Sequence, residues 1–285
     1  MLKTRIPIHH KELSTEGIEM LPFKDLSQGP AMPHRDDHYM FILQQKGRSS
    51  WTIDFKQWPL EQVAVCFVAP GQVHQCLLNE HAKCWMLFIE PKLIPMEYRT
   101  TIDSFMYNRQ VIELKIDHPV FALAEILYDF MQQGEKVFYQ SILHAHINAL
   151  IGQLTAAFVP QSQLYQSRSS HKYQLVTMFK SLIRQQFKEI KQVKYYAEQL
   201  HITPLYLNEV SKEITGFIAS YWIQNEVLLE AQRSLFYTNM DIKEIAFSLG
   251  YEDHTYFSRF FKKNLGCTAG QFRQKNHYLS NYTHE

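Results

Sequence analysis

The sequence predicts an α+β protein in two parts: a small β-barrel or sandwich with accompanying helices, then an all-α part in which one helical design occurs twice. Aromatic and β-branched runs separated by turn residues dominate the region from 20 to about 95. Helical periodicity replaces them from about residue 97, and a polar stretch without periodicity interrupts it at 160–170. A chain of 285 residues is long enough for two domains.

The β prediction rests on four short apolar runs, at 39–43, 51–55, 63–68 and 84–89, that are rich in strand-favouring residues. Strands at this spacing are typical of an antiparallel barrel or sandwich, and we assign residues 1–95 to this β domain. Turn-forming residues separate the runs at Lys46-Gly47, Pro59, Pro70-Gly71, Asn79 and Pro91.

Two helices are predicted after the β domain. Apolar side chains recur at helical spacing from Phe121 to Met131 and again from Ile142 to Leu154. Their apolar stripes either pack on the β domain or form a dimer seam. We assign the rest of the chain as a helical dimerisation segment at 96–160, a linker at 161–170 and a separate helical domain at 171–285.

Bulk properties argue against several classes of protein. We expect no secretory signal and no membrane helix, because the start is polar and no run approaches ~20 apolar residues. Cys66, Cys76, Cys84 and Cys267 have no CxxC spacing, which favours a reduced, cytoplasmic setting over a zinc ribbon or redox site. No phosphate-binding loop, dinucleotide-binding motif or nucleophile elbow is present, so we expect neither an enzyme nor a cofactor.

Residues 193–212 have the pattern of a helix-turn-helix. This motif needs a small residue where two helices cross, a tight turn and an apolar residue in that turn. Ala197 and Ile202 meet two of these needs, and Thr203 followed by Pro204 is a strong helix start. His201 occupies the turn position where glycine is common.

The same design returns 49 residues later, with Ala246 as the equivalent crossing residue. Its first helix ends at Gly250, Tyr251 is the apolar turn residue, and Asp253 caps a second helix over 254–263. Between the two motifs, a helix over 218–237 would be about 30 Å long. This length is close to the ~34 Å between successive major-groove faces on one side of B-DNA, which favours a two-site DNA reader.

The C-terminal part resembles the AraC/XylS family of transcription regulators. The resemblance covers about 171–275 and implies a DNA-binding regulator, more often an activator, that dimerises, responds to a small-molecule effector and contacts RNA polymerase. The departures from the family pattern are Ala269 in place of proline, Glu226 and Val227 where arginine is common, and Glu209 in place of a basic residue. The residues that carry the resemblance are Ile242–Lys263, Gly266, Thr268, Phe272-Arg273, Thr215-Gly216 and Leu229–Ala231.

Outward positions on the two recognition helices are the predicted contacts to double-stranded DNA. We expect Arg259 to bind guanine in bidentate fashion, Asn208 to pair with adenine, and the lysines to neutralise phosphates. The predicted contacts are Leu205, Tyr206, Asn208, Glu209, Lys212, His254, Thr255, Ser258, Arg259 and Lys262.

The N-terminal half resembles the cupin-like β-barrel that such regulators use as an effector domain. The resemblance rests on Pro33–Tyr39 and on Pro70-Gly71-Gln72-Val73-His74. We assign no metal ligand, although His34, His38 and His74 could converge on a metal together with Asp36 or Asp37. The predicted effector-binding residues are His34, Tyr39, Phe41, Trp51, His74 and Phe88.

Two alternatives remain open at this point. A metal-dependent cupin enzyme with a helical appendage predicts stoichiometric metal and loss of turnover in His74→Ala. A helical protein-interaction module predicts no salt-dependent binding to DNA, whereas phosphate-contacting proteins lose affinity steeply with salt.

Overall fold

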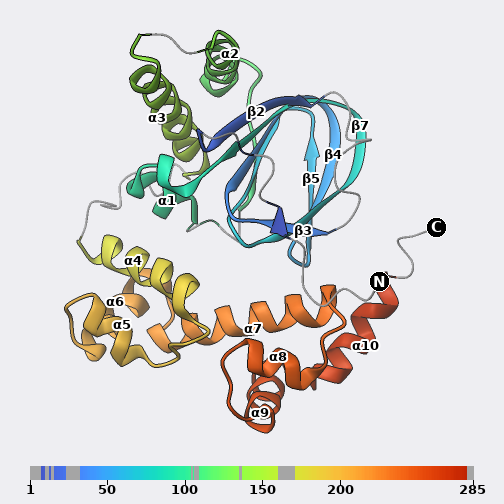
Figure 1. Ribbon diagram of the computed structural model, residues 1–285, viewed down its shortest axis with the longest axis vertical. Helices are drawn as coiled ribbons and strands as arrows, with labels where there is room; N and C mark the ends of the chain where they lie inside the picture. The colour runs from blue at the N-terminus through green and yellow to red at the C-terminus, as the bar shows by residue number, and fades with distance from the viewer. Residues whose placement is uncertain are drawn as a thin grey trace. The chain divides into compact units, whose positions relative to one another are not determined.

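The computed structural model describes residues 8–9, 13, 16–23, 33–103, 105, 109–134, 137–159 and 171–280. The described residues from 8 to 159 and those from 171 to 280 form two compact units (Figure 1). The predicted linker at 161–170 lies outside the described residues.

The N-terminal unit is built on one eight-stranded sheet, with hydrogen-bonded order β1-β3-β7-β4-β6-β8; β2 pairs with β7 and β5 with β4. Only the β1–β3 pair is parallel among the described pairs. The strands are β1 (Ile8–His9), β2 (Ile18–Phe23), β3 (His34–Asp36), β4 (Tyr39–Ile53), β5 (Lys56–Glu61), β6 (Ala64–Val68), β7 (Val73–Ile89) and β8 (Val111–Glu113).

Two strands are much longer than the sequence indicates. The predicted turns at Lys46-Gly47 and Asn79 are wrong, because both lie inside long strands, in β4 and β7. Register shifts on either side of Lys46 let β4 bend without ending. Gly47 has φ +82°, and a Cβ there would lie 2.6 Å from the Cα of Ala82 in β7. A glycine at this position therefore serves a close crossing of two strands.

Pro59 also lies within a strand rather than in a turn. It is tolerated because β5 pairs only with β4 among the described strands, so its other edge needs no donor. The predicted turn at Pro70-Gly71 is confirmed, between β6 and β7.

The sheet is bent, but its described strands do not close into a ring. β1 and β8 end the hydrogen-bonded order and are not paired with each other. The coarse prediction of a β-rich unit with accompanying helices is confirmed, whereas a closed cupin-like barrel is not.

Side-chain alternation gives the sheet two apolar faces. Along β4, Tyr39 and Phe41 belong to a cluster that includes residues of three helices. Met40 and Ile42 belong to a second cluster on the other face. The helices are α1 (Met96–Asp103), α2 (Pro119–Gln132) and α3 (Tyr139–Phe158), preceded by the short η2 (Pro91–Leu93).

The C-terminal unit consists of helices around a core of its own. They are α4 (His171–Gln186), α5 (Val193–Gln199), α6 (Pro204–Thr215), α7 (Ala219–Tyr237), α8 (Ile242–Ser248), α9 (His254–Leu265) and α10 (Ala269–Ser280). No helix in the described part of the chain has the length and apolar character needed to cross a bilayer.

Candidate nucleic-acid interface

Two helix pairs in the C-terminal unit repeat each other closely. α5 and α8 have 7 residues each, and α6 and α9 have 12 each. In the first pair the Ile202 amide donates to the carbonyl of Ala197 over 3.0 Å; in the second the Tyr251 amide donates to Ala246 over 3.0 Å. Both alanines are fully buried, so a side chain with no more than a methyl group occupies each helix crossing.

Both turns pass through a left-handed residue. His201 has φ +55° and Gly250 has φ +76°. Glycine adopts this conformation without a steric penalty, whereas histidine bears a cost. The first motif therefore keeps the turn geometry despite the residue that replaces the common glycine.

Polar caps define where each helix begins. The Thr203 hydroxyl accepts from the Tyr206 amide over 3.2 Å, and the Asp253 carboxylate accepts from the Thr255 amide over 2.7 Å. This hydrogen bond from the Thr255 amide lowers the pKa of Asp253. Asp241 and Glu244 form a reciprocal capping box at the start of α8. α6 and α9 both end at a left-handed glycine, Gly216 and Gly266.

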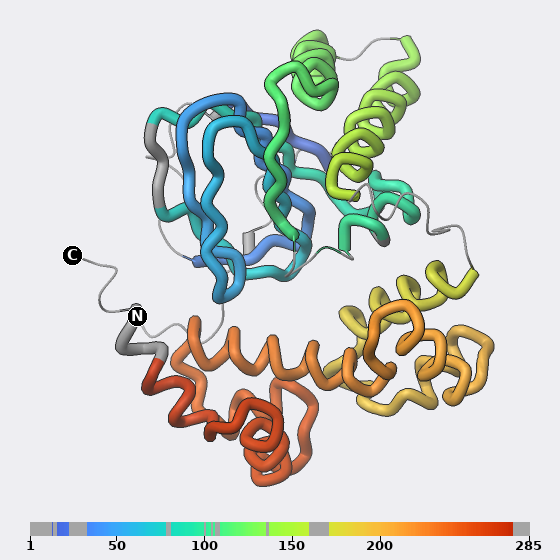
Figure 2. The backbone as a smooth tube through the Cα atoms, turned by 180° about the vertical axis from the view of Figure 1, so that it is seen from behind, coloured from blue at the N-terminus to red at the C-terminus, as the bar shows by residue number. Residues whose placement is uncertain are grey.

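α7 connects the two helix pairs, as Figure 2 shows from behind. Its 19 residues make a rod about 28 Å long, and Ile218 is its N-cap rather than its first residue. Near the first motif α7 contacts α4, α5 and α6, and near the second motif it contacts α8 and α10. It is therefore packed along its length rather than solvent-bridging.

The predicted contact positions on α9 are available to a ligand. His254, Thr255, Arg259 and Lys262 are exposed, and Ser258 is half-buried with its hydroxyl donating to the carbonyl of His254. Phe257 and Phe261, on the opposite face, are buried in the core. The helix is thus anchored on one side and polar and cationic on the other.

The equivalent face of α6 is less cationic. Leu205 is 69% exposed, and Glu209 and Lys212 are exposed as well. Tyr206 is half-buried and packs against the core. An exposed leucine suits contact with a thymine methyl group, and the exposed acid at 209 opposes phosphate binding.

Asn208 has a structural task that the sequence did not indicate. Its amide nitrogen donates to the carbonyl of Pro204 over 3.1 Å, and its amide oxygen accepts from the Ala219 amide, also over 3.1 Å. The side chain thereby serves a backbone donor at the first residue of α7. Pairing with adenine would need the same two groups and would compete with these bonds.

A scan against family models matches residues 196–275 to "Helix-turn-helix domain", a span from α5 to α10 that contains both motifs. The HTH-type transcriptional regulator YfiF of Bacillus subtilis is 24% identical over 249 residues, 84% of this chain and 78% of that protein. The arabinose operon regulatory protein of Salmonella typhimurium is 29% identical over 77 residues, 27% of each chain. Among solved structures, ToxT from Vibrio cholerae O395 is 12% identical, with 92% of this chain and 98% of that chain covered and a TM-score of 0.41.

The C-terminal unit contains an AraC-type helix-turn-helix domain, and the chain is similar to AraC/XylS-family transcription regulators. The chain thus carries a DNA-binding helix-turn-helix domain of the AraC type, which supports double-stranded DNA as its partner. The relatives are transcription regulators, although one of them, AdaA of Bacillus subtilis, is also a DNA repair enzyme.

One exposed aromatic residue near the predicted contacts was not among the residues predicted from the sequence. Tyr256, in the first turn of α9, is 62% exposed, and its ring lies 6.0 Å from that of Tyr251. The dense run of aromatic residues from 256 to 261 is typical of a core-facing helix. The helical spacing that buries Phe257 and Phe261 also turns Tyr256 outward, so the signal was present.

The regulator's six predicted effector residues do not form one group. Tyr39 and Phe41 lie in the cluster shared with the helices, and the Tyr39 hydroxyl donates to Asp103 over 2.7 Å. Trp51 and Phe88 lie in the cluster on the other face of the sheet. His34 and His74 are also buried and contact each other, with ring centroids 4.3 Å apart.

Proposed function

We propose that the protein is a transcription activator that places α6 and α9 in successive major grooves of double-stranded DNA. The observation that carries the proposal is the matched pair of helix-turn-helix motifs on a 19-residue rod. A rod of about 28 Å, with the width of the flanking helices, suits the ~34 Å repeat of the groove. Such a regulator acts on chromosomal DNA, so we propose a cytoplasmic location and a contact with RNA polymerase.

The charge of the two reading helices supports an unequal division of labour. The exposed end of α9 carries Arg259, Lys262 and Lys263. α6 carries Lys212 with Glu209 and Glu213, and Glu213 pairs with Lys172 over 2.7 Å. We therefore propose that α9 contributes most of the phosphate attraction, and that α6 contributes mainly shape and apolar contacts.

Two substitutions in α9 test this proposal by fluorescence anisotropy on target and scrambled duplexes. Arg259→Ala should weaken target binding by about 1–3 kcal/mol and reduce discrimination, because a bidentate guanine contact is lost. Lys262→Ala should weaken binding to both duplexes equally and lower the salt slope by about 1. Lys115→Ala, exposed in the sheet unit, is the control. Wild-type affinity in both α9 variants would refute the proposed docking.

We further propose that residues 1–95 form the cupin-like effector domain, that 96–160 form the helical dimerisation segment, and that 161–170 link them to the DNA-binding domain. The sheet face that carries Trp51 and Phe88 supports an effector site, with His34 and His74 as its polar members. Tyr39 and Phe41 belong to the cluster shared with the helices, so we do not propose them as contacts on this face of the sheet. Trp51→Ala should then change effector-dependent transcription from a reporter while basal DNA binding is retained; unchanged effector response would oppose this assignment.

A homodimer is the proposed assembly. The buried stripes of α2 and α3 pack against the sheet, which leaves Ile126 exposed on α2 and Val137, Phe138 and Ile142 exposed at the start of α3. Exposed apolar groups of this size favour association with a second copy. Sedimentation of the full chain should show a dimer that Phe138→Asp weakens, and a wild-type monomer at assay concentrations would exclude this assembly.

A further inference from the structure

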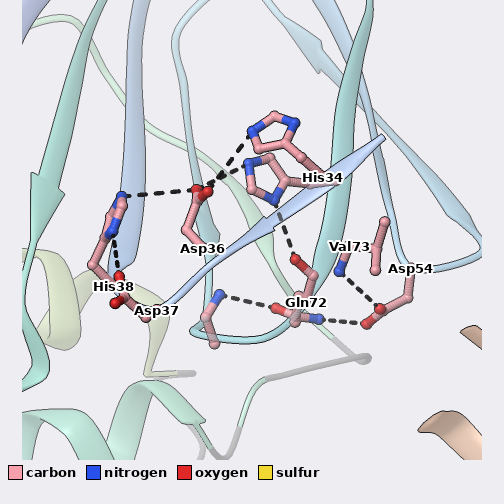
Figure 3. A network of polar contacts seen from close by, with 9 residues as sticks. His34, Asp36, Asp37, His38, Asp54, Gln72 and Val73 are labelled. Atoms are coloured by element: carbon pink, nitrogen blue, oxygen red, sulfur yellow. Dashed lines mark hydrogen bonds and ion pairs between the residues drawn. The ribbon is translucent and has the colours of Figure 1, made fainter. Parts of the chain in front are cut away.

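Four buried polar side chains converge in the N-terminal sheet (Figure 3). His34 and Asp36 lie on β3, His38 precedes β4, and His74 is on β7; their exposed fractions are 8%, 5%, 1% and 2%. The three Nε2 atoms surround one carboxylate. His34 Nε2 lies 3.8 Å from Asp36 Oδ1, while His38 and His74 Nε2 lie 3.8 and 3.3 Å from Oδ2.

The outer nitrogens of two of these rings fix their tautomers. His74 Nδ1 lies 3.2 Å from the carbonyl oxygen of Gln72, which can only accept, so Nδ1 carries the hydrogen. His38 Nδ1 likewise lies 3.1 Å from the carboxylate of Asp37. In the neutral form of each ring, Nε2 therefore presents a lone pair to the Asp36 carboxylate. Two acceptors facing each other repel, so the arrangement requires a cation between them.

The distances favour a metal ion over protons as that cation. Protonated rings would close to hydrogen-bond distance, about 2.7–3.2 Å, whereas His34 and His38 each lie 3.8 Å from the carboxylate and only His74, at 3.3 Å, approaches that distance. Within the described part of the chain, Asp36 Oδ1 and His38 Nε2 have no hydrogen-bond partner. Ligands about 2.0–2.1 Å from a tetrahedral zinc ion are about 3.3 Å from each other. The ligand atoms of His34, Asp36 and His74 all lie within 4.8 Å of one another.

Hydrogen bonds around the cluster hold it in place without a ligand. Gln72 accepts from the Ala69 amide over 3.0 Å and donates to Asp54 over 2.9 Å, which fixes the turn before His74. The Gly71 amide donates to the carbonyl of Asp36 over 2.8 Å, which ties β3 to that turn. His34 and His74 are direct cross-strand partners. Hydrogen bonds of this kind around metal sites hold the ligand side chains in the orientation that binds the ion.

We propose that His34, Asp36 and His74 bind a divalent transition-metal ion through two Nε2 atoms and a carboxylate oxygen, with His38 as the fourth neighbour. Imidazole nitrogens select zinc, iron, cobalt or nickel over calcium and magnesium, which prefer oxygen. The ion joins β3 to β7 and replaces the repulsion between lone pairs and carboxylate by coordination. This inference is independent of DNA binding.

Metal titration of the full chain tests the site directly. Protein stripped with a chelator is titrated with Zn²⁺ against a chromophoric competitor, and separately with Co²⁺, whose visible absorption reports the coordination geometry. We expect one ion per chain and a four-coordinate Co²⁺ spectrum. Asp36→Asn and His74→Ala should each weaken Zn²⁺ binding by more than about 100-fold, the upper range for loss of an outer-shell partner. His144→Ala, exposed on α3, should bind like wild type.

The wild-type protein alone can overturn the proposal. Failure of stripped wild-type chain to take up either Zn²⁺ or Co²⁺ refutes it, whether or not the variants fold. Wild-type binding in Asp36→Asn and His74→Ala, with circular dichroism matching wild type, also refutes it because the ion is then held elsewhere. DNA affinity, measured on the same preparations, tests the proposed function separately, so either can fail alone.

Discussion

Replacing Gly250 by alanine should destabilise the C-terminal unit far more than the same change at Gly266. Both glycines are left-handed, with φ +76° and +72°, so both variants bear the conformational cost of about 1–2 kcal/mol. Their surroundings differ. A Cβ on Gly250 would overlap the carbonyl oxygen of Lys188 and lie 3.0 Å from the Lys191 ammonium, whereas nothing lies within 4 Å of a Cβ on Gly266.

The steric clash should add about 1–3 kcal/mol at Gly250, because a backbone carbonyl cannot move aside as a flexible side chain does. We therefore expect Gly250→Ala to lose about 2–5 kcal/mol, and Gly266→Ala about 1–2 kcal/mol. The free energy of unfolding of a typical domain is about 5–15 kcal/mol, so the loss in Gly250→Ala is large enough to populate the unfolded C-terminal unit.

Urea unfolding followed by circular dichroism, with hydrogen exchange measured on peptides from α8 and α9, reports both losses. The Gly266→Ala variant is the matched control for the left-handed backbone. Losses that agree within about 0.5 kcal/mol would show that contact with Lys188 does not constrain Gly250, and the steric reasoning would fail.

Three further outcomes are expected. Asn208→Ala should cost about 1 kcal/mol by freeing the α7 amide, whereas Asn208→Asp keeps that acceptor and should unfold near the wild-type urea midpoint; equal losses would argue against the cap. Asp241→Ala should cost about 0.5–2 kcal/mol in the same assay, while Glu252→Ala, exposed and outside any cap, should cost little; similar losses would contradict the capping box. Burial raises the pKa of the Tyr251 phenol above its value of about 10 in the unfolded chain. The stability that the neutral phenol contributes is therefore complete below about pH 10 and is lost as the pH rises towards the pKa in the folded state. The urea midpoint of the wild-type protein should decrease as the pH rises beyond about 10, and that of Tyr251→Phe should decrease less steeply. Parallel plots of midpoint against pH for the two proteins would show that Tyr251 does not cause the loss.

The helix-turn-helix motifs could be predicted because their determinants are local. A cap, a left-handed turn and a small crossing residue all lie within a few positions of one another, as at Thr203, Gly250 and Ala246. The task of Asn208 could not be predicted in this way. Its partner Ala219 is 11 residues away, and a helical-wheel argument treats any half-exposed polar residue as available.

The sheet was predicted less well because its shape depends on distant pairing. Lys46-Gly47 has the residue types of a turn, but Gly47 lies where β4 passes close to the backbone of Ala82, and this contact between distant residues cannot be read from the local sequence. In the histidine cluster, the sequence named three rings but left the carboxylate open between Asp36 and Asp37. Strand alternation decides it, because His34 and Asp36 point to the same side of β3.

The loop between α4 and α5 contacts the turn of the second motif. The Lys191 ammonium donates to the carbonyl of Gly250 over 3.3 Å and to that of Lys188 over 2.7 Å. The two helix-turn-helix motifs are thus joined at two points, along α7 and across this loop. The second connection resists rotation of one motif against the other. One base pair inserted between the half-sites rotates one of them by about 34–36°. Under the proposed docking of α6 and α9, an operator with such an insertion should therefore weaken the contacts of one of the two motifs, so the spacing of the half-sites should contribute to selectivity.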